Sequence, residues 1–170
     1  MDTSELEAAY RAVLDLAATS GPGSRPDPPA GGADRAGDGS DQAWRPQDVL
    51  AHLVLNDRLL ARAVRSVLEG AAQPYDNAAA VDLADLRDLG ERLGGTAGLI
   101  GALEASSREL LELAGRLDQA QADTPLPARI LDGDELRVDR PLPVAGLLTI
   151  QARAHLPMHR RQLSELLGRS

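Results

Sequence analysis

Apolar residues recur every three or four positions in four stretches of this chain, which is the spacing of one face of an α-helix. The four stretches cover about residues 4–19, 46–69, 81–117 and 143–167. Pro46 suits the first turn of the second helix, because the amide hydrogen that proline lacks would have no partner there. Gly94 and Gly95 interrupt the third stretch, so we expect that helix to bend or break at this point.

Two connections between these helices have a composition of their own. Residues 21–42 hold six Gly and four Pro, which predicts a long flexible loop, most simply a tolerated insertion. Pro125 and Pro127 exclude a helix before the fourth stretch. The Asp-Gly pair at 132–133 favours a tight turn, so we expect a short hairpin or an extended flap over residues 130–138.

The composition supports a helical domain. The chain has 29 Leu and 28 Ala but only 11 Ile and Val together, and Leu and Ala favour helices whereas β-branched residues favour strands. We therefore predict an all-α fold, a single four-helix-bundle domain over residues 1–170. Its long loop follows the first helix, and its small hairpin or flap precedes the fourth.

Charge and missing residue types narrow the function. The 26 acidic residues outnumber 18 Arg, and the net charge of −8 argues against nucleic-acid binding. The chain has neither Cys nor Lys, which excludes a thiolate nucleophile and a Schiff base of its own. No apolar run approaches the roughly 20 residues that cross a membrane. With no signal peptide evident in the acidic N-terminal segment, we expect a cytoplasmic protein.

The three histidines are the most informative residues. His155 and His159 are four positions apart, which places both rings on one face of the fourth helix. His52 lies beside the apolar stripe of the second helix. Facing helices of a bundle can close such a set around one metal ion, with metal–nitrogen distances of roughly 2.0–2.1 Å and all three nitrogens within about 6 Å of one another. The alternative is that each is a half-buried core histidine with one hydrogen bond.

Other side chains near these positions could support the histidines or contact a substrate. Asn56 lies one turn beyond His52, where it could contact a substrate or be solvated. Gln151 and Gln162 flank the histidine pair. They could orient the ligands, or they could simply lie at the border of the apolar core. Arg153 is a candidate polar contact for a substrate, although a solvated arginine is the simpler interpretation. Pro157 lies between the two histidines and should kink the helix, which could spread the rings or re-aim them.

Three segments together resemble a known family. They are WRPQDVLAHL at 44–53, PYDN at 74–77 and RAHLPMHRRQL at 153–163. Their order and spacing resemble the DinB-like superfamily, in particular its actinobacterial branch of mycothiol-dependent maleylpyruvate isomerase and related thiol S-transferases. The resemblance spans about residues 44–167. The departures are the 21–42 insertion and Pro157.

The resemblance implies a divalent ion, often zinc or nickel, held at positions that match His52, His155 and His159. It implies a metal-dependent transferase or isomerase that activates a small thiol, such as mycothiol, for reaction with an electrophilic small molecule. The histidines would then act through the metal. Asn56 and Arg153 are candidate polar contacts for the substrate because they lie near the histidines in the sequence, and the resemblance itself assigns them no role. Two alternatives stay open: a hydrolase that uses the ion to activate water, and a non-catalytic metal- or ligand-binding bundle. The expected partner is a small molecule, with neither nucleic acid nor membrane, and a homodimer is one further option.

Overall fold

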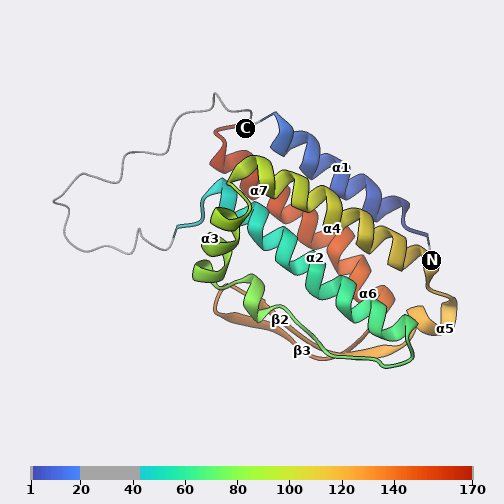
Figure 1. Ribbon diagram of the computed structural model, residues 1–170. Helices are drawn as coiled ribbons and strands as arrows, with labels where there is room; N and C mark the ends of the chain where they lie inside the picture. The colour runs from blue at the N-terminus through green and yellow to red at the C-terminus, as the bar shows by residue number, and fades with distance from the viewer. Residues whose placement is uncertain (1, 20–42, 170) are drawn as a thin grey trace.

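The computed structural model describes residues 2–19 and 43–169, and the loop predicted at 21–42 lies outside them. The described part is mostly helical and carries one small three-stranded sheet (Figure 1). The longer helical elements are α1 (Ser4–Ala18), α2 (Pro46–Leu68), α3 (Leu83–Arg92), α4 (Thr96–Arg116), α6 (Val144–Ile150) and α7 (Leu156–Leu166). The shorter ones are the 3₁₀ turn η2 (Ala78–Ala80), α5 (Gln119–Ala122) and the π-helical segment η3 (Gln151–His155). None of these helices combines the length and apolarity that crossing a membrane requires.

The predicted helices form within a few residues of their expected ends. Pro46 occupies the first turn of α2 as predicted. The third stretch is broken into α3 and α4, because Gly94 and Gly95 adopt φ angles of +78° and +82° that side-chain-bearing residues rarely reach. Asp82 caps α3 by accepting hydrogen bonds from the backbone amides of Ala84 and Asp85.

The helix α2 lies at the centre of the packing. It packs against α4, α3 and α7, while α1 packs against α7, η3 and α4 (Figure 1). The side chains of α2 are buried around most of its circumference, as expected of a helix with neighbours on several sides. Leu50, Leu53 and Leu60 are at most 2% exposed, and each such leucine stabilises the fold by about 1.5–3 kcal/mol relative to an exposed one.

The hairpin is longer than predicted and belongs to a sheet. The strands β2 (Pro125–Asp132) and β3 (Glu135–Pro143) pair antiparallel around Gly133 and Asp134. A two-residue strand β1 (Tyr75–Asp76), which the pattern did not predict, pairs parallel with β2. At an irregularity after Ile130, the amide of Asn77 bonds both backbone groups of Leu131, donating at 2.9 Å and accepting at 2.7 Å. This contact ties β2 to the segment that follows α2.

The fourth predicted helix is continuous but contains a π-helical turn. The amide of Leu156 donates to the carbonyl of Gln151, five residues earlier, directly before Pro157. A proline inside an α-helix removes one hydrogen bond and crowds the carbonyl four residues before it. The wider turn at Gln151–His155 accommodates the helix at this point, so Pro157 does not separate the two histidine rings, whose centroids lie 4.5 Å apart.

Candidate metal centre

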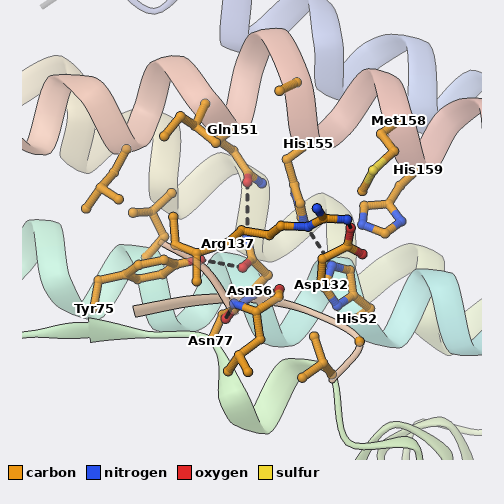
Figure 2. Close-up of a pocket in the computed structure, with 18 of the residues that line it drawn as sticks. His52, Asn56, Tyr75, Asn77, Asp132, Arg137, Gln151, His155, Met158 and His159 are labelled. Carbon is orange, nitrogen blue, oxygen red and sulfur yellow. Dashed lines mark hydrogen bonds and ion pairs between the residues drawn. The ribbon is translucent and has the colours of Figure 1, made fainter. Parts of the chain in front are cut away.

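Three helical elements bring the histidines together. His52 comes from α2, His155 from the end of η3 and His159 from α7, and Figure 2 shows their rings facing one another. Three candidate ligand atoms, one from each residue, lie within 4.8 Å of one another, so the group could hold a metal ion. The predicted convergence is therefore confirmed.

Hydrogen bonds to the rings identify which nitrogens carry protons. His52 Nδ1 lies 2.5 Å from the carbonyl oxygen of Ala80, which can only accept, so this nitrogen donates and Nε2 keeps its lone pair. His159 Nδ1 likewise lies 2.8 Å from the amide oxygen of Gln162, which leaves its Nε2 as an acceptor. A partner that fixes one ring nitrogen of a ligating histidine is a regular feature of protein metal sites.

His155 completes the set and shows why a cation fits here. Its Nε2 lies 2.7 Å from Nε2 of His52, so it must donate the proton in that contact. Its Nδ1 is then a buried acceptor with no hydrogen-bond partner among the described residues. A divalent cation between the rings would replace the proton shared by His52 and His155, and the proton could move to Nδ1. The donor set therefore fits a metal.

The surroundings keep all three imidazoles neutral. Burial lowers the pKa of His52 to about 3, with a further contribution from nearby His159. Burial is also the main cause that lowers the pKa of His155 and of His159. Neutral imidazoles offer the lone pairs that a metal requires, whereas imidazolium rings would repel it. Trp44 covers one side of the group, with its ring centroid 5.3 Å from that of His52 and 6.1 Å from that of His159.

A cavity of about 480 Å³ adjoins the histidines. It lies between α2, the β2–β3 hairpin and the run from α6 to α7 (Figure 2). Much of its lining is apolar and includes Leu60, Ile130, Leu131, Leu147, Ile150 and Met158. A cavity of this size and lining is typical of a site for a small molecule.

Charged side chains from the hairpin also line the cavity. Arg137 donates to Asp132 at 3.1 Å and to Glu135 at 2.8 Å, and all three side chains are about half exposed or more. Figure 2 shows Arg137 and Asp132 beside the histidines. The charge of Asp132 acts to raise the pKa of His159, although burial of that ring outweighs it.

The other residues predicted to belong to the site differ in whether they line the cavity or contact a histidine. Asn56 is buried, lines the cavity, donates to Gln151 at 3.0 Å and accepts from the hydroxyl of Tyr75 at 2.5 Å. Gln162 bonds to the ring of His159, whereas the hydrogen bonds described for Gln151 go to Asn56, Tyr10 and Asp57. The structure corrects the prediction that Arg153 contacts a substrate. Its exposed guanidinium pairs with Glu5 of α1 at 2.7 and 2.9 Å and does not line the cavity. Residues two positions apart on a helix face different sides, so its closeness to His155 in sequence was misleading.

Sequence reasoning missed a buried polar cluster next to the histidines. Asp57 is fully buried on α2 and accepts hydrogen bonds from Tyr10, Ser106 and Gln151. Burial raises the pKa of the Asp57 carboxyl to about 7. The signal was available, since the residues three and four positions away on either side of Asp57 are all apolar, namely Leu53, Val54, Leu60 and Ala61.

Comparisons of the whole chain with protein-family models, with curated proteins and with solved structures gave no match.

Proposed function

We propose that this chain is a four-helix-bundle enzyme of the DinB-like type that binds a divalent metal ion at His52, His155 and His159. In this proposal the bundle consists of α1, α2, α4 and the run from α6 to α7, and the enzyme joins a small external thiol, such as mycothiol, to an electrophilic small molecule or isomerises it. The observation that carries the proposal is the convergence of the chain's three histidines, all neutral, beside a cavity.

The chemistry of the donor set supports this function. A divalent ion, when bound, supplies Lewis acidity that lowers the pKa of a thiol or water beside it. Three neutral imidazoles do not themselves compensate its double positive charge, which favours an anionic partner such as a thiolate. The chain has no Cys, so the thiol has to come from outside.

The residues around the cavity have separate tasks in this proposal. Ala80 and Gln162 hold the rings of His52 and His159 in the tautomers that a metal requires. The apolar lining excludes water from the reacting groups, which strengthens electrostatic interactions there. Asn56 offers the substrate an amide N–H, because only one of its two is used by Gln151 in the described contacts.

Metal binding and thiol conjugation test the proposal separately. We expect the purified protein to bind one Zn²⁺ or Ni²⁺ per chain, and His155→Ala to lose this binding while keeping its helical circular dichroism. Arg160→Ala is the matched control, because this residue adjoins His159 in the sequence and its side chain is exposed to solvent. A screen of electrophiles with mycothiol, with and without metal, should find turnover that needs both.

Each other outcome leads to a different function. Turnover that needs metal but no thiol would identify a hydrolase. Stoichiometric metal binding without turnover across the screen would favour a non-catalytic binding module. Failure to bind Zn²⁺ or Ni²⁺ would refute the metal centre, and the histidines would then be core residues.

A further inference from the structure

A network of buried hydrogen bonds joins four helical elements beside the histidines. Its centre is Asp57 of α2, which accepts from Tyr10 of α1 and, at 2.9 Å, from Ser106 of α4. Gln151 of η3 donates to the same carboxyl at 3.0 Å and to the hydroxyl of Tyr10 at 3.1 Å. All four side chains are at most 5% exposed. The network is thus the point where α1, α2, α4 and η3 are connected by polar contacts.

Two contacts one helical turn apart link α2 to η3. The first is the 2.7 Å contact between His52 and His155, and the second is the 3.0 Å hydrogen bond from Asn56 to Gln151. Asn56 follows His52 by four residues, and His155 follows Gln151 by four, so the two contacts form the rungs of a short ladder between the helices. Figure 2 shows Gln151 directed toward Asn56 and His155 directed toward His52. The rungs together determine how far η3 slides or turns relative to α2.

The ladder matters because η3 is the least regular part of the C-terminal helical run. A π turn is uncommon, and it persists where surrounding contacts favour it. Gln151 begins this turn, and both ends of its amide are engaged: the oxygen by Asn56, the nitrogen by Asp57 and Tyr10. His155 ends the same turn. Gln151 and His155 are therefore the two ends of one turn, and side chains of α1 and α2 anchor its first residue.

We propose that Asp57 is a positioning residue for the metal centre, acting through Gln151 to hold η3 so that Nε2 of His155 faces Nε2 of His52. The inference rests on the proposed metal site but concerns a residue that touches none of its ligands. What Asp57 contributes is a hydrogen-bond acceptor in a fixed place. Metal ligands need placement to within about 0.5 Å, so a loosened support of this kind weakens binding without removing a ligand.

Asparagine can supply the same acceptor, which provides a rescue variant. In Asp57→Asn the remaining oxygen can accept from Gln151 and Tyr10, while the new amide N–H donates to the hydroxyl of Ser106. Ser106 can then direct its own proton to the carbonyl of Leu103, 3.3 Å away. In Asp57→Ala all three donors lose their acceptor. In Gln151→Met, a change of similar side-chain size, the link to η3 is cut while Asp57 keeps its other two donors.

The test compares Zn²⁺ affinity, measured by competition with a chromophoric chelator, across these variants. We expect Gln151→Met and Asp57→Ala to weaken binding about 10- to 100-fold, whereas Asp57→Asn stays within about threefold of the wild type. Ser106→Ala is the matched control: it removes a donor from the other oxygen of the same carboxyl, so it should lower stability without lowering affinity. If Asp57→Ala does not fold, Gln151→Met and Asp57→Asn decide the question.

Nuclear magnetic resonance of the histidine rings in metal-free protein provides a second measurement. The wild type should show the proton shared by Nε2 of His52 and His155, and Gln151→Met should lose this signal. Unchanged affinity and unchanged ring signals in Gln151→Met would overturn the inference, and so would an Asp57→Asn variant as weak as Asp57→Ala. If the wild type binds no Zn²⁺ or Ni²⁺, the proposed function fails, and the ring signals alone support or overturn the positioning role.

Discussion

Replacing Asp57 by asparagine should change how the stability of the protein depends on pH. Burial raises the pKa of this carboxyl to about 7 in the folded protein, from an ordinary value of 3.8. The folded state therefore holds one more proton on Asp57 than the unfolded state between these two pH values. A raised pKa in the folded state contributes stability that is present in full at low pH and is lost as the pH rises through 7. The asparagine amide does not titrate in this range, so the variant lacks this dependence.

The size of the effect follows from the two pKa values. Each pH unit between them corresponds to about 1.4 kcal/mol, so wild-type protein should lose about 3 kcal/mol relative to Asp57→Asn between pH 4.5 and pH 7.5. The three histidines also titrate on unfolding, and their lowered pKa values reduce stability as the pH falls below 6.5. They are present in both proteins and cancel in the difference, which isolates Asp57.

The assay is urea unfolding followed by circular dichroism at several pH values, on metal-free protein. The free energy of unfolding of Asp57→Asn minus that of the wild type should rise steadily from pH 4.5 to 7.5. Ser66→Ala is the control, because it removes a buried hydroxyl from α2 without changing a titratable group, and its difference from wild type should stay constant. A difference for Asp57→Asn that is equally flat, within about 0.5 kcal/mol, would refute the raised pKa.

Three further predictions concern the site, the core and the hairpin. Zn²⁺ should change the fluorescence of Trp44, the single tryptophan of the chain, because its ring adjoins those of His52 and His159, and His52→Ala should abolish the response. Leu53→Ala should lower the free energy of unfolding by about 2–5 kcal/mol in urea titrations, whereas the exposed Leu136→Ala should stay within about 0.5 kcal/mol. Gly133→Ala should cost about 1 kcal/mol in the same measurement, because this residue turns the hairpin at a φ of +58°.

The sequence alone determined most of the helical architecture. Apolar spacing located the helices, Pro46 located the start of α2, and Gly94 and Gly95 located the break between α3 and α4. These features are local, because helix periodicity, a missing amide hydrogen and positive φ angles act within one or two turns of the chain. The strand β1 was not predicted, since two residues carry no periodic signal and its pairing with β2 joins segments about 50 residues apart.

In the candidate site, too, some features followed from the sequence and others depended on tertiary contacts. The spacing of His155 and His159 and the apolar neighbours of His52 allowed the three rings to meet, and the resemblance of the surrounding segments to a metal-binding family favoured this over three separate core histidines. The tautomers were not predictable, because the acceptor for His52 is a backbone carbonyl, that of Ala80, which the chain folds into place. The role of Pro157 and the network of Asp57 also depend on tertiary contacts, since the turn at Gln151–His155 is held by side chains from other helices. Sequence periodicity specifies which face of a helix is buried, and only packing decides which buried polar atoms meet.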